Sequence, residues 1–381
     1  MFPPLESAQG TTLSLLHSCQ ASCHWERRSM RRTKVLTVVG ARPQFIKAAA
    51  VSRAIAVAQN CEEVLVHTGQ HFDADMSQVF FDELGIPTPQ YNLDIHGGGH
   101  GEMTGRMLIA LEPVLKAEKP SAVIVYGDTN STAAAALCAA KLSIPVVHVE
   151  AGLRSFNRRM PEELNRIVAD HLSDMLLAPT RLAVNNLARE GITQKVHHIG
   201  DVMYDVTLYA TARAAQHSTV VERLGLVDKE FAVATVHRAE NTDDPRALKA
   251  VMDLLRAEAR TRPMVVPLHP RTRAAAASAG VSLEGLLVVP PVGYLDMHRL
   301  LSGAAKVFTD SGGLQKEAYF HRVPCVTLRD ETEWLETVEA GWNRLWHGPD
   351  YSMRREIEEY GNGEAAKEIV ELLLMRFGSR A

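Results

Sequence analysis

Residues 122–150 read AVIVYGDTNSTAAAALCAAKLSIPVVHVE, and this stretch has the pattern of one complete strand–helix–strand unit. The runs Ala122–Tyr126 and Pro145–Val149 are short, apolar and nearly uninterrupted, as expected for strands buried on both faces of a parallel sheet. Between them, Asn130–Leu142 is mostly alanine, which suits a helix packed close to a sheet. The stretch therefore predicts an α/β fold.

The same alternation extends in both directions along the chain. Further strand-like runs occur at Val35–Val39, Glu63–His67 and Met175–Ala178, and a second series occurs at Phe231–Val236, Met264–Leu268, Leu286–Val289, Lys306–Thr309 and Cys325–Leu328. Segments of helical period separate them. The pattern predicts two Rossmann-like, doubly wound domains that face each other across a cleft.

The expected organisation has four parts. Residues 1–33 form an N-terminal extension without fixed structure, and residues 34–205 form the N-terminal Rossmann-like domain. Residues 206–362 form the C-terminal Rossmann-like domain, which binds a nucleotide. Residues 363–381 form a C-terminal helix that packs back on the first domain.

Composition excludes several classes of protein. The chain has 381 residues, enough for two cores, with 46% hydrophobic and 23% charged residues and a net charge of −4. This charge argues against nucleic acid as a partner, and no apolar run approaches the roughly 20 residues that span a bilayer. The five cysteines show no metal-site spacing beyond one Cys-x3-Cys at Cys19 and Cys23 in the N-terminal extension, and we expect reduced thiols in a cytoplasm. Because neither a G-x-G-x-x-G fingerprint nor a Walker A motif occurs, we expect no cofactor.

Polar residues follow many of the predicted strands. Ligands of open α/β sheets bind beyond the carboxyl ends of the strands. The residues at these positions are Arg42, Gln70, His71, Asp128, Glu150, His237, His269 and Asp310.

The segment Asp310–Glu317 (DSGGLQKE) is the strongest candidate for an anion site. Gly312 and Gly313 let a backbone approach a ligand, and the N–H groups of the following helix point at it. Ser311 fits this site, although it also fits an ordinary helix cap. Glu317 is placed to bind ribose hydroxyls, or is a solvated helix charge. Arg42 and Lys47 add positive charge that suits a diphosphate, although Lys47 alone also fits a surface lysine.

The segment His148–Arg166 (HVEAGLRSFNRRMPEELNR) is dense in charge. Glu150 follows a buried strand, whereas Glu162 and Glu163 follow Pro161 in the expected first turn of a helix, where acids are favoured. The segment is either an acid/base cluster or a solvated turn. We interpret Glu150 and Glu162 as acid/base candidates and Glu163 as a helix-start charge. Taken alone, Asp128 also fits a helix cap, and His237 fits a structural histidine.

These motifs together resemble those of the non-hydrolysing UDP-N-acetylglucosamine 2-epimerases. The resemblance covers residues 34–381, and its motifs occur in the family's order: Gly40-Ala41-Arg42-Pro43, Thr68-Gly69-Gln70-His71, Gly127-Asp128-Thr129, His148–Arg154, Pro161–Arg166, His237-Arg238 and Asp310-Ser311-Gly312-Gly313. It implies the GT-B, glycogen phosphorylase-like arrangement of two Rossmann domains. It also implies an isomerase that inverts C2 of a UDP-N-acetylhexosamine by eliminating UDP to a glycal and adding it back.

The resemblance also implies roles for individual residues. The residues that match the family's catalytic set are Asp128, Glu150, Glu162 and His237. The residues expected to bind substrate are Arg42, Lys47, Gln70, His71, Arg154, Arg166, His269, Ser311, Gly312, Gly313 and Glu317. Expected partners are a UDP-sugar and a second copy of the chain in a homodimer, with no nucleic acid and no membrane.

Two segments depart from the commonest family pattern. Arg329–Trp334 (RDETEW) stands where Thr-Glu-Arg-Pro-Glu is usual, and the glycine-rich loop His96–Gly101 is distinctive. Both resemble the branch that acts on UDP-2,3-diacetamido-2,3-dideoxyglucuronate in O-antigen synthesis. A uronate needs an extra cation near C6, and the candidates are Arg158, Arg159 and Arg238.

Three other functions remain open at this point. A GT-B glycosyltransferase shares the fold and the diphosphate site, and a hydrolysing 2-epimerase shares the chemistry at C2. A nucleotide-sugar sensor without catalysis is the third alternative.

Overall fold

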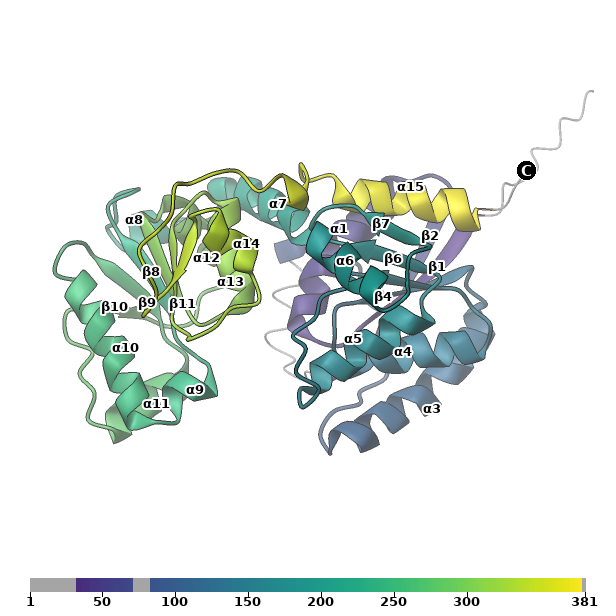
Figure 1. The fold of residues 1–381 in the computed structure, drawn as a ribbon, viewed down its shortest axis with the longest axis horizontal. Coiled ribbons are helices and arrows are strands. Elements are labelled where there is room, and N and C mark those ends of the chain that lie inside the picture. The colour runs from purple at the N-terminus through teal and green to yellow at the C-terminus, as the bar shows by residue number, and fades with distance from the viewer. Residues whose placement is uncertain (1–31, 71–82, 379–381) are drawn as a thin grey trace, which may run out of the picture.

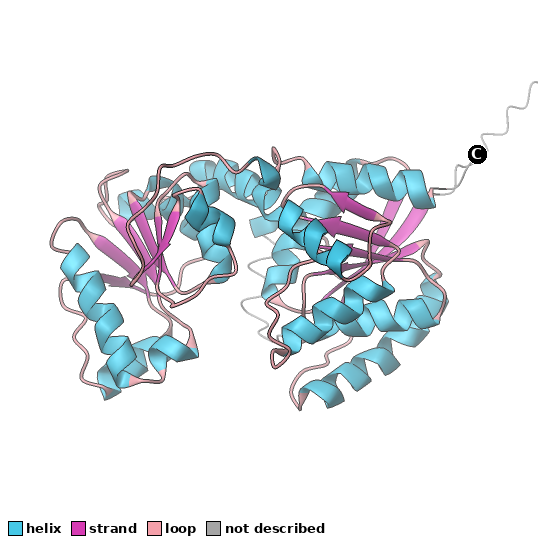
Figure 2. Ribbon diagram, viewed as in Figure 1, coloured by secondary structure: helices cyan, strands magenta, loops and turns pink. Residues whose placement is uncertain are grey.

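The computed structural model describes residues 32–70 and 83–378. Two parallel sheets lie side by side, and helices flank both, as Figure 1 shows by chain position and Figure 2 by secondary structure. The first sheet has the order β3-β2-β1-β4-β5-β6-β7 and the second has the order β10-β9-β8-β11-β12-β13. Both orders start near the middle of a sheet and wind outward in two directions. The predicted pair of doubly wound Rossmann-like units is therefore confirmed.

The strands of the first sheet are β1 (Thr33–Val39), β2 (Cys61–His67), β3 (Tyr91–Asn92), β4 (Ala122–Tyr126), β5 (Val146–Val149), β6 (Met175–Ala178) and β7 (Val196–His198). Those of the second sheet are β8 (Ala232–Thr235), β9 (Met264–Pro267), β10 (Leu287–Val289), β11 (Lys306–Thr309), β12 (Cys325–Thr327) and β13 (Asn343–Leu345). In the register, Val35 pairs with Glu63 on one side and with Ala122 on the other.

The helices of the first half are α1 (Arg42–Val57), α3 (His100–Glu118), α4 (Asn130–Lys141), α5 (Pro161–Leu172) and α6 (Arg181–Arg189). They are followed by α7 (Val202–His217), α8 (Val220–Arg223), α9 (Ala239–Thr242), α10 (Pro245–Glu258), α11 (Pro270–Ser278), α12 (Tyr294–Gly303), α13 (Gly312–Phe320), α14 (Leu335–Glu339) and α15 (Ala365–Phe377), with a short 3-10 helix at Glu358–Tyr360.

The central strands are apolar because both of their faces are covered. All five residues of β4 are fully buried, and the alanines of α4 allow this helix to pack against the sheet and against α3 and α5. The ten strand-like runs of the sequence all contain strands. Three short strands, β3, β7 and β13, were not predicted. They lie at sheet edges and are two or three residues long with polar members, so they lack the apolar run that marks a buried strand.

The helix α7 joins the two halves (Figure 1). It packs against α1 of the first half and against α12 and α13 of the second. Its N-terminus is capped by Asp201, whose Oδ1 accepts the backbone N–H of Met203 at 2.9 Å. The expected division at residues 205 and 206 falls inside this helix.

The C-terminal helix α15 returns to the first half and packs on α1 and α7. Asp205 of α7 holds its N-terminus, since its carboxylate accepts the N–H of Ala365 at 3.3 Å and that of Ala366 at 2.9 Å. At the other end of the chain, β1 begins at Thr33, one residue earlier than the predicted start of the first domain at residue 34. Residues 1–31 of the N-terminal extension lie outside the described residues. Among the described helices, none combines the length and apolar character needed to cross a membrane.

Candidate active site

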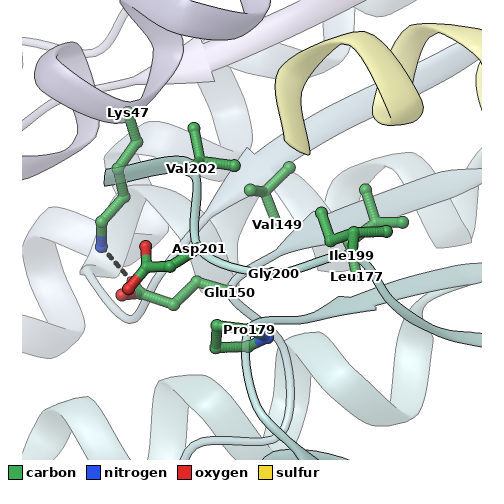
Figure 3. Close-up of a pocket in the computed structure, with 9 residues that line it drawn as sticks. All are labelled: Lys47, Val149, Glu150, Leu177, Pro179, Ile199, Gly200, Asp201 and Val202. Carbon is green, nitrogen blue, oxygen red and sulfur yellow. Dashed lines mark hydrogen bonds and ion pairs between the residues drawn. The ribbon is translucent and has the colours of Figure 1, made fainter. Parts of the chain in front are cut away.

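Glu150 lies at the carboxyl end of β5, beside the junction between the two halves. Figure 3 shows Lys47 of α1 reaching its carboxylate, with Asp201 beside the same group. These three side chains line a small pocket together with Val149, Leu177, Pro179, Ile199, Gly200 and Val202. Residues of the first sheet, of α1 and of the start of α7 therefore line the same pocket.

The backbone at Glu150 is strained, which marks a position with a specific task. Its φ of +71° lies in the left-handed region that residues other than glycine rarely adopt. Gly127, with φ +59°, makes room for the side chain, because a Cβ there would lie 3.3 Å from Glu150 Oε2 and 3.4 Å from Lys47 Nζ. The absence of a side chain at Gly127, in the turn after β4, therefore leaves space for the Glu150 carboxylate from the turn after β5.

Glu150 is held in its charged form. Burial alone would raise the pKa of this carboxyl, but the charges of Lys47, Lys316 and Arg166 outweigh burial and lower it to about 2. Lys47 forms an ion pair with Oε2, and Lys316 Nζ lies 3.5 Å from Oε1. Lys47 is thus no free surface lysine. Lys316 was missed by the sequence analysis, since a lysine in a short helix has no distinguishing pattern.

Asp128 and Arg166 form the next part of the site. Two nitrogens of Arg166 donate to Asp128 Oδ2 at 2.7 and 3.0 Å, and a third donates to Glu163 Oε2 at 2.6 Å. Arg166 therefore orients Asp128, which is about one-third exposed at the turn after β4. Glu162 stands in the first turn of α5, half-buried.

Glu163 has a different environment from the solvated helix-start charge that we expected. It does stand in the first turn of α5, but it is buried, and its carboxylate accepts N–H groups of Ser155 and Phe156, each at 2.9 Å. Together with Arg166 these donors lower its pKa despite burial. Glu163 fixes the loop that connects Glu150 to α5.

His237 lies beyond the end of β8 in the second half, with its side chain half exposed. Its Nδ1 is 2.9 Å from Oδ1 of the buried Asp310. The other oxygen of Asp310 accepts the N–H groups of His237 and Arg238, each at 2.9 Å. His269, after β9, is exposed and caps α11 by accepting the N–H of Arg271 at 3.3 Å. Asp310 positions the loop that carries His237.

The predicted anion loop begins α13. Ser311 caps this helix by accepting the N–H of Leu314 at 3.5 Å, so the capping interpretation is confirmed, while its binding of a ligand stays a prediction. At Gly312 a Cβ would lie 2.2 Å from Oε1 of Glu333, so a larger residue there would have to displace this glutamate side chain. At Gly313 a Cβ would meet nothing within 4 Å, so the helix N-terminus is open on that side.

Glu317 is buried one turn into α13 and is not a solvated helix charge. Burial raises its pKa to about 7, against the opposing influence of Arg42, of a hydrogen bond from the Tyr294 hydroxyl at 3.4 Å and of Lys316. Arg42, at the first residue of α1, acts on Glu317 from the first half. The charges of these two residues thus interact although they belong to different halves.

Two predicted binding residues follow β2. Gln70 accepts the N–H and hydroxyl of Ser131 at 3.1 and 2.8 Å, which ties its loop to the N-terminus of α4. His71 lies outside the described residues.

Arg154 does not face the cleft. Its side chain is only 1% exposed, and its guanidinium binds Asp170 Oδ2 at 2.7 Å and Glu190 at 2.6 and 2.8 Å. Asp170 also lies 2.7 Å from the buried His148, whose Nε2 is 2.8 Å from the Gly127 carbonyl. This network braces the turns around Glu150. The geometry therefore gives Arg154 a structural position, and its expected contact with substrate stays a prediction.

The site is suited to acid/base chemistry beside an anion. The carboxyl of Glu150, whose side chain is 12% exposed, stays ionised, whereas that of the buried Glu317 titrates near neutrality. The open start of α13 suits a phosphate group. Within residues 32–70 and 83–378, no cluster of three or more His, Cys, Asp or Glu side chains is placed to hold a metal ion.

Paired Rossmann-like units with this site at their junction define a GT-B-like nucleotide-sugar enzyme. A solved structure of a UDP-GlcNAc 2-epimerase from Methanocaldococcus jannaschii, in complex with UDP-GlcNAc and UDP, superposes with a TM-score of 0.78 at 40% identity, covering 90% of this chain and 99% of that one. The enzyme from Neisseria meningitidis bound to UDP-GlcNAc gives a TM-score of 0.80 at 31% identity, covering 90% of this chain and 100% of that one.

Sequence comparison identifies the family. The family model for UDP-N-acetylglucosamine 2-epimerase matches residues 53–374. A UDP-2,3-diacetamido-2,3-dideoxy-D-glucuronate 2-epimerase of Pseudomonas aeruginosa is 51% identical over 357 residues, which is 89% of this chain and 99% of that protein. This chain belongs to the UDP-N-acetylglucosamine 2-epimerase family, and it is an isomerase.

Proposed function

We propose that this enzyme inverts C2 of UDP-2,3-diacetamido-2,3-dideoxy-D-glucuronate without net hydrolysis. The observation that carries the proposal is the 51% identity, over nearly the full length of both chains, to the Pseudomonas aeruginosa enzyme of that name. UDP-GlcNAc is the second candidate substrate. The 40% identical Methanocaldococcus jannaschii enzyme, solved with UDP-GlcNAc and UDP, favours it.

The chemistry explains why the site combines carboxylates with an anion loop. The hydrogen on C2 is not adjacent to a carbonyl group, so direct deprotonation is too costly. A base instead removes the C2 proton while the C1–O bond breaks and UDP leaves with the bonding electrons, which gives a glycal. UDP then adds back to C1, and an acid delivers a proton to the opposite face of C2. The released UDP must stay bound between the two steps.

The residues divide into two groups in this proposal. Glu150 and Glu162, with Asp128 and His237, supply acids and bases for the two faces of C2. The low pKa of Glu150 suits a group that is ionised at the start of the reaction. Arg166 acts by orienting Asp128.

Nucleotide binding is assigned to the second half. Ser311, Gly312 and Gly313 at the N-terminus of α13 receive the diphosphate, and Arg42 adds positive charge from the facing half. Glu317 accepts ribose hydroxyls. Lys47 pairs with Glu150, while Gln70, His71 and His269 complete the rim of the cleft.

A uronate carboxylate requires a cation that UDP-GlcNAc does not need. Arg158 and Arg159 are exposed on the loop between Glu150 and α5, and Asn157 Oδ1 accepts the N–H of Arg159 at 3.1 Å. We assign the C6 carboxylate to these arginines or to Arg238. We also propose a cytoplasmic homodimer for bacterial surface polysaccharide synthesis. The buried, free Cys61, Cys138 and Cys325 are compatible with a reducing compartment, and light scattering of the purified protein tests the dimer.

The test is an NMR assay of the purified enzyme in heavy water with each UDP-sugar alone. We expect the manno form of the diacetamido-uronate to appear with deuterium at C2. Epimerisation of UDP-GlcNAc at a higher kcat/KM would reverse the choice of substrate. Stoichiometric free UDP would indicate a hydrolysing enzyme, and a product that requires an acceptor would indicate a glycosyltransferase. Binding without deuterium incorporation would indicate a sensor.

A further inference from the structure

Lys316 is a buried cation at the junction of the two halves. Its side chain is only 2% exposed, although the residue lies on α13 of the second half. Its Nζ is 2.5 Å from Asp201 Oδ2 and 3.5 Å from Glu150 Oε1. The same nitrogen lies 4.0 Å from the centre of the Trp334 ring. The charge is thus enclosed by two carboxylates and one aromatic face.

A buried ammonium group is costly unless it is paired and hydrogen-bonded. Asp201 alone provides a close partner for Lys316, and Asp201 also caps α7. The approach to Glu150 is therefore an additional contact that the ion pair with Asp201 does not require. It extends the influence of Lys316 from the start of α7 to the Glu150 carboxylate that follows β5.

The position of Lys316 on α13 gives that contact a consequence. The helix begins at the Ser311-Gly312-Gly313 loop, and Lys316 is followed directly by Glu317. Lys47 holds one oxygen of Glu150 from the first half, whereas Lys316 approaches the other oxygen from the second. Each oxygen of the Glu150 carboxylate therefore lies next to a cation from a different helix.

We propose that Lys316 is a positioning residue for catalysis: it orients the Glu150 carboxylate and couples it to the helix that binds the nucleotide diphosphate. This inference rests on the proposed function, because it takes Glu150 as an acid/base residue and α13 as the nucleotide helix. It gives the enzyme a way to align its base through the same helix that holds UDP.

Several charged groups set the charge state of Glu150. Lys47 faces it from α1, Arg166 acts on it from α5, Lys316 approaches from α13, and Asp201 at the start of α7 lies beside it. Glu336 of α14 acts on Lys316 in turn. Removing Lys316 leaves two cations, so Glu150 stays ionised near pH 8 and becomes easier to protonate in acid.

The test compares Asp201→Asn with the double variant Asp201→Asn/Lys316→Gln. The asparagine keeps an oxygen to cap α7, and it removes the buried anion that Lys316→Gln alone would leave unpaired. The difference between these variants therefore isolates the action of Lys316 on Glu150. Lys306→Gln is the matched control, because Lys306 lies in the same half on β11 and pairs with Glu258 at 3.3 Å.

We expect kcat of the double variant to be about tenfold below that of Asp201→Asn at pH 8, and the ratio to fall further as the pH is lowered. The Kd for UDP should change by no more than about twofold between the two variants. Lys306→Gln should keep the wild-type rate and pH profile. Lys316→Arg, which keeps the charge in the native background, should keep the wild-type pH profile.

Three results would overturn the inference. One is a double variant with the kcat of Asp201→Asn, and another is a kcat ratio that does not change with pH while the unfolding temperature drops, as for a purely structural ion pair. The third is a Lys316→Arg protein that folds and yet loses activity at acidic pH. Failure of the proposed function looks different, since the wild-type enzyme itself would then form no epimer from either UDP-sugar.

Discussion

Glu317→Gln should stabilise the nucleotide-free protein at alkaline pH. The carboxyl of Glu317 is 6% exposed, and its pKa rises from the ordinary 4.5 to about 7 in the folded protein. Below pH 4.5 the carboxyl is neutral in both the folded and the unfolded chain, so its ionisation has no effect on stability. As the pH rises through 4.5 towards 7, the unfolded chain ionises first, and folding becomes less favourable.

The structure sets the size of this effect. A difference of about 2.5 pH units between the folded and unfolded pKa corresponds to an upper limit of about 3 kcal/mol above pH 8. Glutamine has nearly the same shape and still accepts the hydroxyl hydrogen bond of Tyr294, but it does not titrate. The free energy of unfolding of the variant, relative to the wild-type protein, should therefore increase with pH.

The assay is urea unfolding of both proteins at pH 5, 6, 7 and 8 without nucleotide. Subtracting the two curves cancels the titration of all other groups. A difference that stays constant from pH 5 to pH 8 would refute the reasoning, and so would a wild-type protein that gains stability over the variant as the pH rises. UDP binding, measured on the same samples, should be weaker in the variant, because ribose hydroxyls lose a charged acceptor.

Three further predictions concern single side chains. Glu150→Gln should lower kcat by a factor of roughly 10²–10⁴ while UDP binding is unchanged, as measured by steady-state kinetics and calorimetry. A raised KM with an unchanged kcat would indicate that Glu150 has a structural role instead. Arg154→Ala should destabilise the fold by about 3–5 kcal/mol in denaturant unfolding, because it removes the guanidinium that pairs with the buried Asp170. Unchanged stability with a raised KM would instead support a substrate contact. Asp205→Ala should cost about 1–2 kcal/mol by removing the cap of α15, and it should speed hydrogen exchange in α15 but not in α10; equal exchange in α15 of both proteins would contradict this.

The sequence was sufficient for the fold because burial in a parallel sheet leaves a local signature. A strand covered on both faces, such as Ala122–Tyr126, must be apolar at every position, and a helix packed closely on it favours alanine. The glycines and polar residues that follow the strands could also be recognised in the sequence, because each of them comes directly after an apolar run. Edge strands such as β7 were not predicted, because a partly exposed strand does not need to be apolar at every position.

The candidate site was only partly accessible from the sequence. Asp128, Glu150, His237 and Ser311 could be proposed as candidates because each follows a strand at the edge of a sheet where ligands bind in this fold class. Lys316 and Glu163 were not identified as site residues, since within their helices they look like ordinary solvated charges. The pairing of Arg154 was also not visible in the sequence, because its guanidinium is buried against Asp170 and Glu190, which lie 16 and 36 residues further along the chain.

The sequence by itself thus determined the two Rossmann-like units, the family and the strand ends that carry polar side chains. Only the tertiary structure decided which charges meet. Whether a lysine or glutamate can be buried depends on partners from distant segments of the chain. For Lys316 these partners are Glu150 and Asp201. The free energy of such a charge is set by desolvation and by those partners, and neither is encoded within its own helix.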